Sequence, residues 1–152
     1  TVHSADFCKY RQTAACKKIT YCMALGTDIT EVDRIRRIAQ EHPQFLTTVF
    51  TPAEIAYCQS KKNPYQHFAA RFAAKESVMK AIGKGWLQGI AWTDIEVVTL
   101  PSGKPEIRPG TTLAVEMRAQ GIAGFEVSLS HCREYAIAVV SAGVAVPDKK
   151  GR

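Results

Sequence analysis

Apolar residues recur along the chain with two different periods, and the change of period separates predicted helices from predicted strands. Residues 24–29 alternate and predict a short strand. The faces of that strand are Leu25, Thr27 and Ile29 on one side and Gly26 and Asp28 on the other. Helical spacing then continues as far as residue 40, with Thr30 as the expected cap. The residues that this helix should bury are Val32, Ile35, Ile38 and Ala39.

Two clear start signals predict further helices. Thr51-Pro52-Ala53-Glu54 unites a cap, a first-turn proline and a reciprocal glutamate, so a short helix should begin there. Asn63-Pro64 starts the longest helix, which is expected to reach Ile82 and to end in the segment 83–85. Its apolar stripe has one gap, which Glu76 fills. The stripe consists of Tyr65, Phe68, Ala69, Phe72, Ala73, Met79 and Gly83. A second row, suited to close contact with a neighbouring element, consists of Ala70, Ala74, Ser77 and Ala81.

The second half of the chain alternates with a period of two and predicts short strands around one helix. The strands cover residues 95–99, 105–108, 125–130 and 136–140, and the helix covers residues 111–120. The last strand is apolar throughout, as suits a central antiparallel position, and residues 141–152 are expected to fray. His131 falls in phase with the apolar face of the preceding strand. Because the helices mostly precede the strands, the pattern favours an α+β fold.

The composition fits one soluble globular domain, since the chain has 152 residues, 46% of them apolar and 22% charged. The formal net charge of +6 is gathered at the ends, where residues 1–22 carry +3 and residues 148–152 carry +2. The nearly neutral body argues against a uniformly basic surface that reads nucleic acid. We interpret residues 1–22 as an expression remnant or a flexible arm, residues 23–146 as the domain and residues 147–152 as a disordered tail.

The cysteines and the apolar stretches bear on the compartment. The five cysteines match no zinc signature, and an odd, dispersed set is typical of a reducing environment. The longest nearly unbroken apolar stretch, residues 135–146, is too short to span a bilayer. We therefore expect a cytoplasmic protein whose partners include neither membrane nor nucleic acid.

A few positions carry candidate chemistry. Asp28 ends the first strand and Glu76 interrupts an apolar stripe, where a carboxylate is costly unless it is paired or binds a metal. Each also has a purely structural interpretation, Glu76 as an ordinary pair with Lys80 and Asp28 as a cap of the following turn. Together, two hard oxygen ligands beside Lys80 and Gly83-Lys84-Gly85 predict a site for Mg²⁺ and a phosphorylated ligand. His131 is either a contact to a phosphate or a base, or a satisfied core histidine.

Several segments, in order along the chain, carry a resemblance to a known family. They are Gly26-Thr27-Asp28-Ile29-Thr30-Glu31 with Arg34-Ile35, Phe50-Thr51-Pro52-Ala53-Glu54, Arg71-Phe72-Ala73-Ala74-Lys75-Glu76 with Lys80-Ala81-Ile82-Gly83, Gly103-Lys104-Pro105, and Ser128-Leu129-Ser130-His131. Over about residues 23–141 the chain resembles the short bacterial holo-[acyl-carrier-protein] synthases, which are 4′-phosphopantetheinyl transferases. The third of these segments is the most specific.

The resemblance implies an antiparallel sheet packed against a long helix, and a Mg²⁺-dependent reaction between coenzyme A and an apo acyl carrier protein. A carrier serine attacks the phosphate that bears the pantetheine, and adenosine 3′,5′-bisphosphate leaves. By resemblance, Asp28 and Glu76 hold Mg²⁺, Lys80 stabilises charge on the phosphate, and Glu76 is the candidate acceptor of the serine proton. The positions implied to bind coenzyme A are Arg71, Lys80, Gly83, Lys84, Gly85 and His131. The resemblance fits an acyl carrier protein of fatty-acid synthesis and one of polyketide synthesis equally well.

The family also implies partners. Its short members assemble as homotrimers with each site between adjacent subunits, and an acidic carrier would dock on Arg34 and Arg37, on an exposed flank of the first helix. Where the family often has further basic residues beyond this helix, this chain has Glu41, His42 and Gln44. Two alternative functions remain. One is a module that binds coenzyme A or a carrier protein without turnover, and the other is a nucleic-acid binder that depends on the basic chain ends.

Overall fold

The computed structural model describes residues 21–145, and the expectations for residues 1–20 and 146–152 lie outside the described residues. The α-helices are α1 (Val32–Glu41), α2 (Gln44–Val49), α3 (Pro52–Gln59), α4 (Pro64–Ile82) and α5 (Thr111–Gln120). The strands are β1 (Tyr21–Glu31), β2 (Ile95–Thr99), β3 (Pro105–Pro109), β4 (Ile122–His131) and β5 (Tyr135–Ala145). Two short 3-10 helices, η1 (Trp86–Gln88) and η2 (Trp92–Asp94), separate α4 from β2. Among these residues no helix is both long and apolar enough to cross a membrane.

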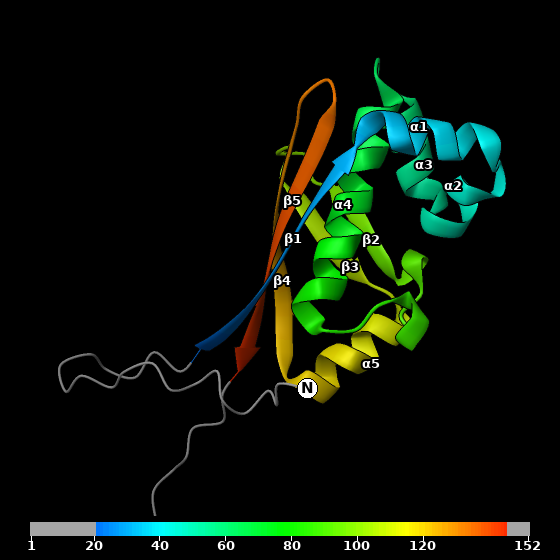
Figure 1. Cartoon of the computed structure of the whole chain (residues 1–152). Helices are drawn as coiled ribbons and strands as arrows, with labels where there is room; N and C mark the ends of the chain where they lie inside the picture. The colour runs from blue at the N-terminus through cyan, green and yellow to red at the C-terminus, as the bar shows by residue number, and fades with distance from the viewer. Residues whose placement is uncertain (1–20, 146–152) are drawn as a thin grey trace, which may run out of the picture.

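The strands form two antiparallel sheets, one with the order β1-β5-β4 and one that pairs β2 with β3. Helix α4 packs along one face of the three-stranded sheet, and α1 to α3 and the two-stranded sheet lie beyond it (Figure 1). Within the described residues no helix covers the other face of the three-stranded sheet (Figure 1). The predicted α+β fold, with an antiparallel sheet on a long helix and β5 as its central strand, is confirmed.

Most of the helices begin and end where the sequence signals predict. Thr51 and Glu54 form the expected reciprocal capping box at the start of α3. Helix α4 ends where Gly83 adopts a left-handed conformation with φ of 69°, which costs glycine little. The predicted cap at Thr30 is wrong, because Thr30 belongs to β1 and its hydroxyl donates a hydrogen bond to Asp28. The short helix α2 was not predicted.

Strands β1 and β5 are longer than predicted because each supplies the other's hydrogen-bonding partner. Their register runs from Tyr21 opposite Ala145 to Glu31 opposite Tyr135. Residues 141–145, which we expected to fray, are therefore paired with the start of β1.

The face of β1 that packs on α4 is the one carrying Gly26 and Asp28. Gly26 and Thr30 are buried, whereas Leu25 and Ile29 are 65% and 63% exposed. The large apolar side chains of β1 thus lie on the uncovered face of the sheet, and the face that carries Gly26 and Asp28 lies against the helix. The reason is steric, since the helix approaches too closely for a side chain at position 26.

The close approach of β1 to α4 rests on small residues from both elements. A Cβ atom at Gly26 would overlap the Ser77 carbonyl oxygen and lie 2.8 Å from the Ala81 nitrogen. Ser77 also donates a hydrogen bond to the Ala138 carbonyl oxygen of β5, at 3.2 Å. The predicted small-residue row of α4 is buried throughout, and its neighbouring element is the sheet of the same chain.

An ion pair is completely buried at the centre of the helical layer. The Lys75 ammonium lies 2.9 Å from a Glu54 carboxylate oxygen, and the two side chains are 0% and 1% exposed. Lys75 also donates to the carbonyl oxygens of Trp92 and Ile95, while Glu54 accepts from the Val97 N–H at 2.9 Å. The pair therefore joins α3, α4, η2 and β2, and all of its charge is neutralised by short contacts.

Replacing Gly26 by alanine should destabilise the fold, because the added methyl group meets helix backbone that cannot rotate away. We expect Gly26→Ala to lower the free energy of unfolding by about 2 kcal/mol or more in urea titrations. The matched control is Gly143→Ala in β5, where an added Cβ meets no atom within 4 Å. Equal stability of the two variants would contradict this account of the contact.

Candidate active site

Asp28, Glu76 and Lys80 lie where β1 crosses α4. Lys80 pairs with Asp28 through a contact of 2.8 Å and donates a second hydrogen bond to the Thr27 carbonyl oxygen at 3.0 Å. The other Asp28 oxygen accepts a hydrogen bond of 2.8 Å from the Thr30 hydroxyl. The two elements therefore hold the Asp28 carboxylate by both of its oxygens. The ordinary Glu76–Lys80 surface pair is not what forms, since Lys80 turns to the strand instead.

Glu76 is the carboxylate left without such support. It is half-buried, and within the part of the chain that the structure describes no side chain donates a hydrogen bond to it. Burial raises the pKa of the Glu76 carboxyl, and the neighbouring Asp28 carboxylate adds to the increase, while Lys80 and Arg34 oppose it. Two carboxylates from different elements thus share one small, partly desolvated region.

This donor set fits Mg²⁺. Oxygen ligands are the ones that Mg²⁺ prefers, and the ion usually takes only one or two protein carboxylates when phosphate oxygens and water supply the rest. Asp28 and Glu76 provide two, and no group of three histidine, cysteine or acidic residues able to hold a metal occurs among the described residues. A cation here would also relieve the repulsion that raises the pKa of Glu76.

The segment Gly83-Lys84-Gly85 follows directly after Lys80 but is occupied by local contacts. The N–H groups of Gly83 and Lys84 donate to carbonyl oxygens of the last helical turn, and that of Gly85 donates to the Gln88 side chain at 2.7 Å. The Lys84 ammonium pairs with Glu116 of α5 at 2.7 Å. In this structure the segment serves the helix end, and its contact with phosphate stays a prediction.

Arg71 belongs to a different side of α4. Five positions separate it from Glu76, which on a helix is a rotation of about 140°. Its guanidinium group donates to the Thr99 hydroxyl of β2 at 3.0 Å and lies 4.0 Å from the centre of the Tyr57 ring of α3. Arg71 is 3% exposed, and its Nε atom is buried with no hydrogen-bond partner in the described part of the chain.

His131 joins this second cluster. Its ring meets the ring of His67 edge to face, with 5.2 Å between the centres, so the predicted side of β4 is right. The residue is exposed, however, and is not a core histidine. We call the group Tyr57, His67, Arg71, Thr99 and His131 the arginine cluster, and the group Asp28, Glu76 and Lys80 the carboxylate cluster.

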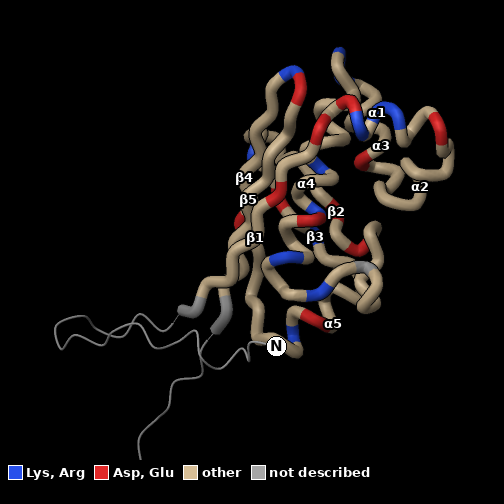
Figure 2. Tube along the Cα trace, in the orientation of Figure 1, with Lys and Arg blue, Asp and Glu red and all other residues tan. Residues whose placement is uncertain are grey.

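The predicted docking residues Arg34 and Arg37 are exposed on α1, as expected. Arg34 is near enough to the carboxylate cluster to act on the pKa of Glu76. Acidic and basic positions follow one another along α1 (Figure 2), and Asp33 lies 3.9 Å from Arg37 and 2.6 Å from Arg36. The exposed side of α1 that carries Arg34 and Arg37 thus begins near the carboxylate cluster at Arg34 and extends away from the cluster along the helix.

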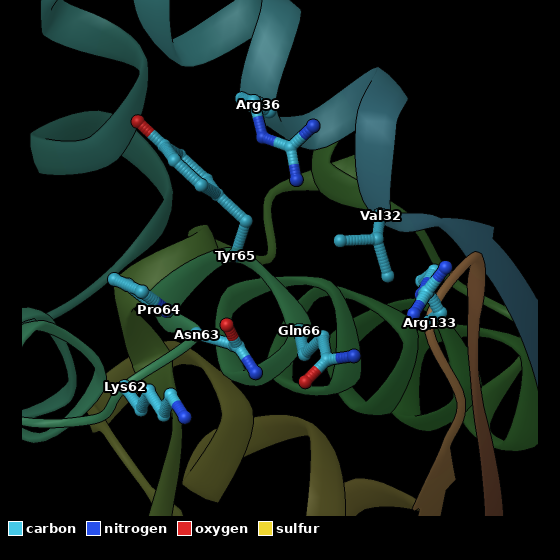
Figure 3. A pocket seen from close by; sticks show the side chains of 8 residues that line it. All are labelled: Val32, Arg36, Lys62, Asn63, Pro64, Tyr65, Gln66 and Arg133. Carbon is cyan, nitrogen blue, oxygen red and sulfur yellow. The ribbon is translucent and has the colours of Figure 1, made fainter.

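Two cavities lie elsewhere. A pocket of about 420 Å³ opens at the start of α4, where Arg36, Lys62 and Arg133 converge from three segments around Tyr65 (Figure 3). Neither this pocket nor a second one of about 340 Å³ beside η2 is lined by a member of the carboxylate cluster. In a single chain the two carboxylates therefore lie outside both cavities.

Comparison with known proteins decides the family. The sequence pattern described as 4′-phosphopantetheinyl transferase superfamily matches residues 24–140. The chain belongs to this superfamily. The resemblance read from the motifs and the transferase class are thereby confirmed.

Individual relatives agree along nearly their whole length. A holo-[acyl-carrier-protein] synthase of Ruminiclostridium cellulolyticum is 47% identical over 131 residues, which are 84% of this chain and 98% of that protein. One from Moorella thermoacetica is 46% identical over 114 residues, covering 75% and 88%. A solved structure from Neisseria meningitidis, 32% identical, superimposes with a TM-score of 0.72 over 78% of this chain and 96% of its own. A Helicobacter pylori synthase in complex with coenzyme A, 29% identical, gives 0.69 over 78% and 98%.

Sequence reasoning missed two features of the site region. Lys75, next to Glu76, is the charge that is truly buried, and only the pairing of α4 with α3 shows this. His67 was not singled out, although it stands one helical turn before Arg71. A search for charged and aromatic residues at a spacing of four along α4 could have found it.

The raised pKa of Glu76 gives a prediction about stability. A carboxyl whose pKa lies above its ordinary 4.5 in the folded state costs stability once it is ionised, so removing it should help. In buffer with EDTA at pH 7 we expect Glu76→Gln to melt at a higher temperature than the unchanged protein. The gain should vanish below about pH 4, where both states hold the proton.

The control for this measurement is Glu41→Gln at an exposed position, which should leave the melting temperature at pH 7 unchanged within error. An equal or lower melting temperature of Glu76→Gln at pH 7 would show that Glu76 is stabilised by its surroundings.

Proposed function

We propose that the chain transfers the 4′-phosphopantetheine group from coenzyme A to a serine of an apo acyl carrier protein and requires Mg²⁺. The observation that carries the proposal is the carboxylate cluster, in which Asp28 and Glu76 share one region beside the Lys80 ammonium. The names of the relatives and the coenzyme A held by the Helicobacter pylori protein support the same reaction. We place the reaction in the cytoplasm, in line with Cys58 and Cys132, which are free thiols.

The chemistry follows from the charges of the cluster. The carrier serine oxygen forms a bond to the phosphorus that bears the pantetheine, and the bond from that phosphorus to the departing adenosine 3′,5′-bisphosphate breaks. Mg²⁺, held by Asp28 and Glu76, would neutralise charge on the pyrophosphate. Lys80 supplies a further positive charge, and its half-exposed side chain lets the ammonium reach a ligand. Glu76, whose carboxylate accepts no hydrogen bond from a side chain in the described part of the chain, accepts the serine proton.

Residues that bind coenzyme A come from two separate sides of α4. The carboxylate cluster faces β1, and the arginine cluster faces α3 and β2. One coenzyme A molecule can use both if the arginine cluster of one subunit stands next to the carboxylate cluster of another. We therefore propose that Arg71 and His131 act in the site of an adjacent subunit, with Gly83, Lys84 and Gly85 beside the pyrophosphate.

The uncovered face of the three-stranded sheet supports this assembly as a homotrimer. Its exposed large apolar side chains are Met23, Leu25, Ile29, Tyr135, Ile137 and Val139. Such a patch on one face of a small domain is typical of a protein interface. Each site would then be completed by a neighbour rather than by the chain's own cavities.

The carrier protein should dock on α1. Arg34 and Arg37 are exposed there, and Arg34 lies beside the carboxylate cluster, so an acidic carrier held on this flank would present its serine to Glu76.

Loss of either carboxylate should stop the transfer. We expect Asp28→Asn and Glu76→Gln to lower the transfer rate by about 100-fold or more while circular dichroism shows a folded protein. The measurement is the mass increase of an apo carrier by one phosphopantetheine arm after incubation with coenzyme A and Mg²⁺.

Two controls make that assay decisive. Glu106→Gln on β3, away from the cluster, should modify the carrier at the normal rate, and EDTA should abolish the modification by the unchanged protein. Full activity of either the Asp28→Asn or the Glu76→Gln variant would refute the assignment of these residues as metal ligands. Binding of coenzyme A with no mass increase under any condition would instead favour the binding module.

The proposed trimer depends on the apolar sheet face. Val139, at the centre of β5 and 45% exposed, is expected to be buried between subunits, so Val139→Glu should give a monomer in light scattering after size exclusion. Val115→Glu on α5, 53% exposed in the same chain, should leave the molar mass unchanged. A monomeric unchanged protein with full transfer activity would refute the shared site.

A further inference from the structure

His67 occupies a position in the arginine cluster that none of the roles above uses. The His67 ring makes edge-to-face contacts with two other rings. Its centre lies 5.2 Å from the centre of the His131 ring and 5.9 Å from the centre of the Tyr57 ring. These contacts orient the imidazole between α3 and the end of β4. The half-buried ring is thus held in place by its neighbours on both sides.

The surroundings of His67 are positively charged from every element that meets it. Lys61 follows α3, Arg71 lies one turn further along α4, and His131 comes from β4. Burial lowers the pKa of the His67 imidazole, and the charges of His131, Arg71 and Lys61 lower it further. No carboxylate is among the groups that act on it in the described part of the chain. The ring is therefore neutral near pH 7 in the free protein.

Arg71 gives independent evidence that an anion belongs here. Its guanidinium is almost fully buried, yet one N–H, that of Nε, has no partner among the described residues. A buried guanidinium that has no carboxylate partner among the described residues is costly, because the Tyr57 ring and the Thr99 hydroxyl compensate only part of its charge and donors. Lys61 lies over the ring of Tyr57, 4.3 Å from its centre, and adds a second cation to the same small region. A dianion bound at this cluster would match the positive charge of Arg71 and Lys61.

We propose that His67 is a further coenzyme A-binding residue, and that it takes up a proton from solvent as it contacts the phosphomonoester of the nucleotide. This inference rests on the proposed function, in which the carboxylate cluster takes the pyrophosphate. The remaining phosphate of coenzyme A is the monoester on its ribose, and the arginine cluster is the region whose charge it matches. His67 donates to that phosphate as an imidazolium and releases the proton when the product leaves.

The linkage has a definite sign. An anion beside His67 raises the imidazole pKa from its lowered value in the free protein, so binding carries a proton with it. Affinity for coenzyme A should then fall as the pH rises. Where one proton is linked, log KM should increase by up to about one unit per pH unit, while kcat is unaffected by this group.

Titration calorimetry of the full chain tests the proton uptake without any turnover. Coenzyme A is titrated at pH 7 in two buffers of different ionisation enthalpy, and the difference in heat gives the number of protons bound. We expect His67→Gln to lose much of the uptake shown by the unchanged protein and to flatten the rise of KM with pH. His42→Gln, an exposed histidine at the end of α1, should match the unchanged protein. Because the phosphate itself titrates near pH 6, only the difference between variants is interpreted.

A second ligand identifies the phosphate. With 3′-dephospho-coenzyme A the unchanged protein and His67→Gln should bind alike, since the group that His67 contacts is missing. His67→Asn serves as a second variant that removes the contact with the phosphate. The melting temperatures of His67→Gln and His67→Asn show whether either variant has instead lost its fold. Equal proton uptake by a folded His67 variant and by the unchanged protein would overturn the inference and leave the proposed function intact. Failure of the unchanged protein to bind coenzyme A would overturn both.

Discussion

The buried ion pair between Lys75 and Glu54 is the contact on which the arrangement of the helical layer depends. Both side chains are withdrawn from water, and every oxygen of Glu54 and the ammonium of Lys75 find short partners. Because breaking one half would leave a buried charge, the pair tolerates only one geometry. It therefore fixes α4 relative to α3 and β2, and α4 carries the residues of both clusters. Lys75 lies between Arg71 and Glu76 in the sequence and anchors the helix between them.

The two sides of α4 divide the chemistry. The side toward β1 collects negative charge with one lysine, which suits a divalent cation and a pyrophosphate. The side toward α3 collects positive charge and aromatic rings, which suits a phosphate and a base. Because one helix cannot turn both of its sides toward the same ligand, the proposed site takes residues from two subunits. The apolar outer face of the sheet gives a physical reason for that association.

Local signals in the sequence predicted what depends on local contacts. The capping box at Thr51, the left-handed end of α4 at Gly83 and the carboxylates at Asp28 and Glu76 are all visible in short segments, and the family motifs contain all four positions. Two errors are local, the cap expected at Thr30 and the unpredicted helix α2, and the others concern partners distant in the chain. The direction of Lys80 and the pairing of residues 141–145 depend on how β1 lies across α4 and along β5. The alternation in β1 shows which residues share a face but not which of the two faces packs on α4.

The contact at Gly26 has a consequence for how the active centre tolerates change. Strand and helix touch there through main-chain atoms, with no side chain between them. The distance between the main chains that carry Asp28 and Glu76 is therefore set by van der Waals contact of backbone atoms, with no core side chain between them. Gly26 thus acts as a fixed spacer between the strand that carries Asp28 and the helix that carries Glu76.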